Sequence, residues 1–238
     1  MTRLEDVISQ ADALLLDFDG PICRLFAGYP NTRAAKVERD FLSTHGIEVP
    51  TESVGTSDPL RLLQWTGTHQ PGLIADVEER LLAAERTAAR TAAPTVHADR
   101  VLKNASESGL GVAVVSNNSA PAVRTYLDMH GLSAYVLAVC GRVPGHPELM
   151  KPNPHLVVRA SQLLGVRAGR CVLVGDSATD MEAAGSARAG SVGYAKTPDR
   201  VAVLKNAGAE VVIEDMAVLA DAITNAASRT EQSVWPIT

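Results

Sequence analysis

Apolar runs alternate with amphipathic stretches along most of the chain. The run at residues 11–18 is continuous, which is typical of a strand in a parallel sheet covered on both faces. Further strands are expected at residues 111–116, 135–140, 171–175, 191–194 and 210–213. Helices are expected between and after them, at residues 97–108, 121–130, 153–164, 178–187, 198–207 and 217–226. This order predicts an α/β fold with a Rossmann-like parallel sheet as its core.

The alternation stops between residues 24 and 94, where no strand is expected. Ala34, Val37, Phe41 and Leu42 have helical spacing, and helices are predicted at residues 32–45, 59–65 and 71–92. We therefore expect a core formed by residues 1–23 and 95–228, interrupted by a helical insertion at 24–94. Residues 229–238 are expected to be a frayed tail, with Trp235 as its strong apolar residue.

Composition narrows the class of protein. The 238 residues are 46% hydrophobic and 21% charged, which is ordinary for a globular protein, and the net charge of -5 argues against a nucleic-acid partner. Cys23, Cys140 and Cys171 are too far apart for a zinc or disulfide framework. Glu5 and Asp6 exclude a signal peptide, and no apolar run is long enough to span a membrane. We expect a cytoplasmic monomer or homodimer with a small-molecule ligand and no membrane partner.

The first apolar run ends in Asp17-Phe18-Asp19-Gly20. If the strand continued, its period of two would turn Asp17 and Asp19 to one side and Phe18 to the other, and Gly20 permits a sharp turn afterwards. Two neighbouring carboxylates repel each other, so either a cation lies beside them or one of them holds a proton. The alternative is a strand that ends in an ordinary polar turn.

Other polar residues follow two further strands or precede a helix. They are Ser116, Asn117 and Asn118, then Asp176, Ser177 and Asp180, and Lys151 in Lys-Pro-Asn-Pro. Taken singly, the serines and asparagines could be helix caps, Ser177 with Asp180 could be a capping box, and Lys151 could be a surface lysine. Taken together they favour one site, because parallel sheets bind ligands at the carboxyl ends of their strands.

Phosphate-ester hydrolysis accounts for this set of residues. Asp17 could attack phosphorus and form an aspartyl phosphate, while Asp19 acts as general acid and then general base. Asp17, Asp176 and the backbone carbonyl of Asp19 offer hard oxygen ligands for Mg²⁺. Lys151 adds a fixed positive charge near the phosphoryl oxygens, and the Ser116 hydroxyl is a neutral donor.

Three more residues complete the predicted site. Asn117 is expected to contact the phosphate together with Ser116 and Lys151. Asp180, with Ser177 beside it, is expected to orient a metal-bound water or Lys151 without binding the metal itself.

The four segments Asp-Phe-Asp-Gly, Ser-Asn, Lys-Pro and Gly-Asp-Ser-x-x-Asp resemble the motifs of the haloacid dehalogenase-like (HAD) superfamily, in that family's order. The insertion resembles the family's helical C1-type cap, as in the phosphoglycolate phosphatase-like subfamily. Asp19 resembles the second aspartate of the Mg²⁺-dependent phosphatases and phosphomutases, which the dehalogenases lack. The resemblance extends over residues 11–227 and is specific for the superfamily, not for a substrate.

The resemblance implies a phosphatase that acts on a small phosphorylated metabolite. A phosphomutase of the β-phosphoglucomutase type and a non-catalytic binding module on the same fold remain alternatives. In capped relatives the insertion selects the leaving group. Arg24 is the preferred specificity residue, because an acid is usual at its position and it follows the first motif closely. The other candidates in the insertion are Arg33, His45, Arg61, Trp65 and His69.

Overall fold

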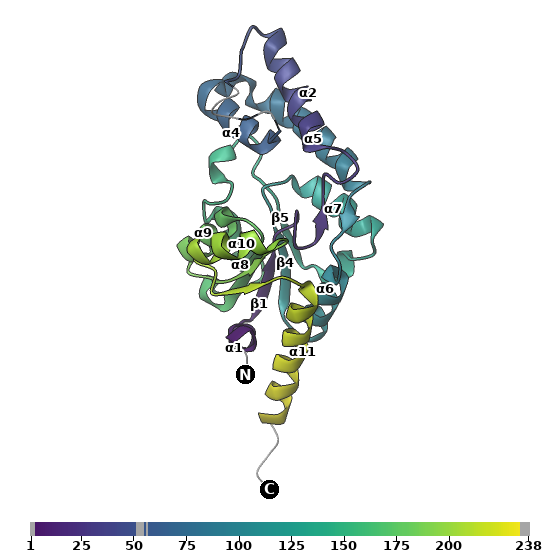
Figure 1. The fold of residues 1–238 in the computed structure, drawn as a ribbon, viewed down its shortest axis with the longest axis vertical. Helices are drawn as coiled ribbons and strands as arrows, with labels where there is room; N and C mark the ends of the chain where they lie inside the picture. The colour runs from purple at the N-terminus through teal and green to yellow at the C-terminus, as the bar shows by residue number, and fades with distance from the viewer. Residues whose placement is uncertain (1–2, 51–54, 56, 234–238) are drawn as a thin grey trace.

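A six-stranded parallel sheet forms the centre of the computed structural model, which describes residues 3–50, 55 and 57–233 (Figure 1). The strand order is β5-β4-β1-β6-β7-β8. Their bounds are β1 Ala13–Leu16, β4 Gly111–Val115, β5 Ala138–Cys140, β6 Cys171–Gly175, β7 Gly190–Tyr194 and β8 Val211–Ile213. Leu16 of β1 is paired with Val114 on one side and Val174 on the other, so the three central strands end together.

Helices cover both faces of the sheet, which explains the continuous apolar runs. Leu14 and Leu16 contribute to a core cluster with residues of four core helices and with Ala88 and Ala89 at the end of an insertion helix, and Ala13 and Leu15 contribute to another cluster with residues of two helices. The first group is α1 Arg3–Ser9, α6 Ala98–Glu107, α7 Ala120–Met129 and α11 Met216–Ser233. The second group is α8 His155–Leu163 and α9 Ala178–Ala187, and α10 Pro198–Asn206 packs beside β7 and β8.

The insertion forms a second layer above the carboxyl ends of the strands, at the end of the molecule opposite α1 and α11 (Figure 1). It contains α2 Asn31–Thr44, α4 Pro59–His69 and α5 Ile74–Ala89. These helices bury a cluster of their own that includes Leu42, Leu62 and Leu81. Two short antiparallel strands, β2 Cys23–Arg24 and β3 Ala93–Pro94, join the insertion to the core. We call residues 24–94 the cap.

Several elements differ from the sequence predictions. No strand was expected between residues 24 and 94, but β2 and β3 reach into the two ends of this range, because they pair with each other there. α11 continues to Ser233, so the predicted tail is helical over its first residues, while Trp235 lies outside the described residues. α1 was not predicted. α4 is longer than expected and reaches His69, and β5 is confined to Ala138–Cys140 because a 3₁₀ turn, η2 Ser133–Tyr135, takes the start of the predicted strand.

Three more 3₁₀ turns connect the helices, η1 Pro71–Leu73, η3 Pro147–Leu149 and η4 Ala168–Arg170. η1 takes the start of the predicted helix at 71–92, so α5 begins at Ile74. α8 begins at His155 with Pro154 as its N-cap, two residues later than predicted. None of the helices in the described part of the chain is long and apolar enough to cross a membrane.

Candidate active site

The polar residues at the strand ends lie around one cavity of about 410 Å³, between the core and α4 of the cap. Its core lining includes every predicted site residue except Arg24, namely Asp17, Asp19, Ser116, Asn117, Lys151, Asp176, Ser177 and Asp180. The backbone explains the convergence, because Asp17 N donates to Val174 O at 2.9 Å and Ser116 N donates to Cys140 O at 2.9 Å. Asp17 and Ser116 therefore both lie just beyond the end of a strand, where their backbone N–H is hydrogen-bonded to the neighbouring strand.

The segment after β1 places two carboxylates at the cavity. Asp17 Oδ1 accepts a hydrogen bond from Phe18 N at 2.7 Å, and Asp19 Oδ1 accepts one from Leu25 N at 3.0 Å. Phe18 points the other way into the core, where its ring meets Tyr126 edge-on at 5.4 Å between centroids. The two acids and the opposed phenylalanine have the arrangement that the period of two predicts.

Lys151 is buried between two carboxylates. Its Nζ lies 2.9 Å from Asp17 Oδ1 and 2.6 Å from Asp180 Oδ1, and it donates to Val115 O at 2.9 Å. Its side chain is 2% exposed. These contacts exclude the reading of Lys151 as a surface lysine.

Asn117 holds the main chain of Lys151 in place. Its Oδ1 accepts from Lys151 N at 2.7 Å, and its Nδ2 donates to Lys151 O at 3.1 Å. Both ends of the amide are therefore engaged with the main chain of Lys151, whereas the sequence predicted that Asn117 would contact the phosphate. The Lys151–Pro152 peptide bond is cis.

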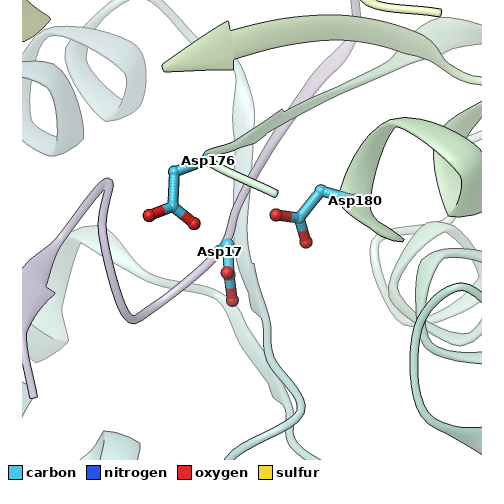
Figure 2. A group of neighbouring side chains, drawn as sticks. All are labelled: Asp17, Asp176 and Asp180. Atoms are coloured by element: carbon cyan, nitrogen blue, oxygen red, sulfur yellow. The ribbon is translucent and has the colours of Figure 1, made fainter. Parts of the chain in front are cut away.

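Asp17, Asp176 and Asp180 bring carboxylate oxygens within 4.8 Å of one another, and Figure 2 shows them turned toward a common space. We call these three residues and Lys151 the site cluster. Hard oxygen donors at this spacing could hold a divalent cation. Asp180 is the most engaged of the three, since Oδ2 accepts from Ser177 N at 3.0 Å and from Ser177 Oγ at 2.6 Å. The free oxygens of Asp17 and Asp176 are therefore better suited to a cation.

Ser177 and Asp180 also form a capping box at the start of α9. The capping box that was one alternative for this pair is present, and both residues also line the cavity. The capping box fixes Asp180 in the first turn of α9, where its Oδ1 lies 2.6 Å from Lys151 Nζ.

Two glycines make room for the carboxylates. A Cβ on Gly20, which has φ +122°, would lie 2.5 Å from Asp176 Cγ, and a Cβ on Gly175 would collide with the carboxyl group of Asp180. The backbone at both positions therefore lies against an acid of the site, and Gly20 also adopts a conformation that other residues avoid.

Burial dominates the electrostatics of the site. It raises the pKa of Asp17 to about 7, against the opposing charge of Lys151 and with the nearby acids adding to the rise. Burial also raises the pKa of Asp19 and of Asp176. Burial alone would lower the pKa of Lys151, but Asp17 and Asp180 outweigh it and raise that pKa, so the lysine is charged.

The cap contributes Asp58, Leu60, Arg61 and Gln64 to the cavity wall. Asp58 is the N-cap of α4 and accepts from Leu60 N and Arg61 N, so the start of this helix lies at the cavity. Arg24 is exposed in β2 and is not among the lining residues. Arg33, His45, Trp65 and His69 are absent from the lining as well, and Trp65 stacks on His69 at 4.8 Å between centroids.

A family model described as haloacid dehalogenase-like hydrolase matches residues 11–188. The chain belongs to this family. The resemblance drawn from the four motifs is confirmed at that level, and the α/β parallel-sheet fold is confirmed with it.

Solved structures agree with this HAD fold. A HAD family hydrolase from Deinococcus radiodurans R1, solved with bound phosphate and sodium, is 24% identical, with a TM-score of 0.61 over 92% of this chain and 97% of that chain. A β-phosphoglucomutase from Clostridium difficile is 16% identical, with a TM-score of 0.66 over 93% and 99% of the two chains.

A curated relative is much longer than this HAD chain. Protein SUPPRESSOR OF QUENCHING 1, chloroplastic, from Arabidopsis thaliana is 25% identical over 253 residues, which cover 98% of this chain. The match spans 22% of that protein, about a fifth of its length.

One residue near the acids of this HAD site was missed from the sequence. Lys196 Nζ lies 2.5 Å from Asp176 Oδ2, and Arg200 donates to Asp176 O at 3.0 Å. Burial would lower the pKa of Lys196, but the negative charges of Asp176, Asp19 and Asp17 outweigh it and raise that pKa. The signal was available, because Lys196 follows the carboxyl end of β7 just as the predicted residues follow their strands.

Proposed function

We propose that this HAD hydrolase is a phosphatase that cleaves a small phosphate ester through an aspartyl phosphate on Asp17. One observation carries the proposal. Asp17, Asp19 and Lys151 line the same cavity, with Lys151 Nζ 2.9 Å from the carboxylate that would attack phosphorus. The phosphate bound to the Deinococcus radiodurans relative is in keeping with such a substrate.

Mg²⁺ is the cation we propose for the site cluster. Asp17 and Asp176 would hold it through carboxylate oxygens and Asp19 through its backbone carbonyl, leaving positions for water. Burial raises the pKa of Asp17 and of Asp176 and neighbouring acids add to the rise, so a cation at this site would stabilise their charged forms. When bound, the ion offsets the charge of these carboxylates and of the phosphoryl group.

The reaction has two balanced steps. In the first, an Asp17 oxygen forms a bond to phosphorus, the bond between phosphorus and the leaving oxygen breaks, and Asp19 gives its proton to that oxygen. In the second, water attacks phosphorus, Asp19 takes a proton from it, and the bond between phosphorus and Asp17 breaks. Burial, which raises the pKa of Asp19, favours the protonated form that the first step needs.

Donors around the phosphoryl group come from two loops. Lys151 supplies positive charge, and the Ser116 hydroxyl supplies a neutral donor at the start of the segment that leads into α7. Asn117 supports this arrangement by holding the peptide of Lys151. Asp180 keeps the Lys151 ammonium close to Asp17.

We assign contacts with the leaving group to Arg61 and Gln64, in place of Arg24. Both line the cavity and lie three residues apart on α4, hence on one face of that helix. The domain bounds predicted from the sequence, core 1–23 and 95–228 with cap 24–94, remain part of this proposal. So does a cytoplasmic location, for which three buried cysteines without disulfides are supporting evidence.

The test is phosphate release with and without Mg²⁺ across sugar phosphates, phosphoglycolate, nucleotides and p-nitrophenyl phosphate. We expect release that needs Mg²⁺ and disappears in Asp17→Asn, whose side chain has nearly the same shape but is a poor nucleophile. An active Asp17→Asn protein would overturn the proposal. Isomerised sugar phosphate without net phosphate release would favour the mutase, and no turnover of any compound would favour the binding module.

A further inference from the structure

A second group of buried charges lies where the cap meets the core. The cap supplies Glu38 from α2 and Glu78 and Glu85 from α5, and the core supplies Arg142 from the segment after β5. We call these four residues the boundary cluster. None of them lines the cavity of the site.

Arg142 joins the two bodies. Its Nε donates to Glu78 Oε1 at 2.8 Å and its Nη1 to Glu85 Oε1 at 2.6 Å. The arginine side chain is 1% exposed and that of Glu85 is fully buried. Ion pairs this deep are poor sources of stability, because desolvation offsets the attraction, so their geometry calls for another explanation.

The carboxylate oxygens of Glu85 also accept hydrogen bonds from the loop 116–119. Oε1 also accepts from Asn118 Nδ2 at 3.1 Å, and Oε2 accepts from the Ser119 backbone N–H at 3.0 Å. Ser119 is the N-cap of α7, where a carboxylate is favoured by the exposed N–H groups of the first turn. Every side-chain hydrogen bond that Glu85 makes within the described residues is therefore with the core.

The contacts continue to the cavity. Ser116 Oγ donates to Asn118 Oδ1 at 3.2 Å, and it accepts from the Asn118 backbone N at 3.1 Å. A cap carboxylate is thus linked through one asparagine to the hydroxyl that we expect to meet the phosphate. Any movement of the cap away from the core would withdraw Glu85 and release the loop.

We propose that Glu85 is a positioning residue. It acts from the cap to hold the loop 116–119 in the conformation that binds the phosphoryl group, and Arg142 balances its charge. The proposal rests on the proposed function, because it takes the loop to be a phosphate site. Arg142 also donates to the loop, from Nη1 to Asn117 O at 3.4 Å and from its backbone N to Asn118 O at 3.1 Å, but Glu85 is the cap side chain that bonds to the loop directly.

Glu78 provides a matched control. It pairs with the same arginine across the same boundary and accepts from Gly145 N at 2.5 Å, but among the described residues it has no hydrogen bond to the loop 116–119. The exposed Glu79 is a second control on the same helix. A purely structural role of the boundary cluster would make Glu78 and Glu85 equivalent in every assay of phosphate binding.

The experiment measures the Kd of orthophosphate in the presence of Mg²⁺ by calorimetry, together with the melting temperature. We expect Glu85→Gln to raise the Kd about tenfold or more, because the amide NH₂ replaces one of the two carboxylate oxygens and cannot accept the hydrogen bond from Asn118 or Ser119 at that position. Glu78→Gln should lower the melting temperature without moving the Kd, and Glu79→Gln should change neither. An equal rise in Glu78→Gln, or an unchanged Kd in Glu85→Gln, would overturn the proposal.

Asn118→Ala keeps the test decisive if Glu85→Gln does not fold. It removes the link to Ser116 and leaves the Arg142–Glu85 pair intact, so it should also raise the Kd, and an unchanged Kd would overturn the proposal. Failure of the proposed function is distinguishable, because the unaltered protein would then neither bind orthophosphate nor release it from esters. Failure of the positioning role leaves both properties in place.

Discussion

The site cluster and the boundary cluster both place three carboxylates near one buried cation, yet they differ in what surrounds them. The acids of the site cluster line a cavity of about 410 Å³, so a ligand can supply the charge that is missing. The boundary cluster is closed over by the cap, and Arg142 and Glu85 are almost without solvent contact. The site cluster is therefore suited to bind a ligand. The boundary cluster is suited to hold the cap in one position on the core.

The two clusters also handle excess negative charge differently. In the site cluster the excess is suited to a divalent cation. In the boundary cluster it is relieved by a proton, because burial raises the pKa of Glu38 to about 9 and the group is neutral near pH 7. Neither oxygen of Glu38 has a hydrogen-bond partner among the described residues.

The largest effect is expected from Lys151→Met, which removes the cation of the site cluster. Asp17 and Asp180 would be left buried without their partner, so we expect phosphate release to fall by about 10³-fold or more and the free energy of unfolding to fall by about 3–5 kcal/mol. Lys205→Met on the exposed side of α10 is the control. Release within about tenfold of the unaltered protein would place the essential charge elsewhere.

Gly20→Ala tests how closely the site cluster is packed. The new Cβ would collide with Asp176, so we expect about 10²-fold slower release and weaker Mg²⁺ binding by calorimetry. Gly208→Ala is a matched control, because its φ of +102° is similar but no atom lies within 4 Å of the Cβ position. It should cost about 1–3 kcal/mol of stability and leave release unchanged, and equal loss of release in both variants would reject the packing argument.

Glu38→Gln tests the proton of the boundary cluster. The unfolded chain loses this proton near pH 4.5 and the folded protein near pH 9, so the free energy of unfolding should fall as pH rises between these values. The charged groups that act on Glu38 are Arg142, Glu85, Asp58 and Arg39. Glutamine abolishes the dependence, and we expect it to stabilise the protein by about 1–3 kcal/mol at pH 8 and hardly at pH 4.

The measurement is the melting temperature of both proteins from pH 4 to pH 9. The difference between them should widen steadily with pH. Parallel curves would mean that Glu38 is ionised in the folded protein. Glu48→Gln, at an exposed position of the cap, should follow the unaltered protein throughout.

The smallest effect concerns Lys196, which pairs with Asp176 at the edge of the site cluster. Its ammonium competes with a metal ion for that carboxylate, so Lys196→Gln should tighten Mg²⁺ binding by about 3- to 10-fold in calorimetry. Lys205→Gln should leave the Kd unchanged. Weaker binding in Lys196→Gln would show that the lysine supports the metal site instead of opposing it.

The site cluster was predictable because its members obey a rule that can be read along the chain. Asp17, Ser116 and Asp176 each follow an apolar run, and parallel strands bring such positions to one edge. The sheet itself followed from the same pattern, whereas the short elements α1, β2 and β3 were not predicted and several boundaries, such as the end of α11, were misplaced. Lys196 obeyed the rule too and was overlooked.

The boundary cluster was not predictable in this way. Arg142 and Glu85 are 57 residues apart and lie on a loop and a helix, where no periodic pattern requires them to meet. The two hydrogen bonds between the Asn117 side chain and the Lys151 main chain were not predicted either. A polar side chain can contact a ligand or a neighbouring peptide, and the sequence does not distinguish the two. Contacts made across packed surfaces depend on the docking of whole elements.

The two-stranded link between β2 and β3 has a consequence for how such a chain could be rebuilt. Cys23 pairs with Pro94 and Arg24 with Ala93, so the chain leaves the core and returns to it at adjacent points. A segment whose ends coincide can be replaced by another of any length without stretching its host. A graft that replaced this segment would need to match the core where Arg142 pairs with Glu78 and Glu85, and also where Leu25, Ala88 and Ala89 join the main core cluster.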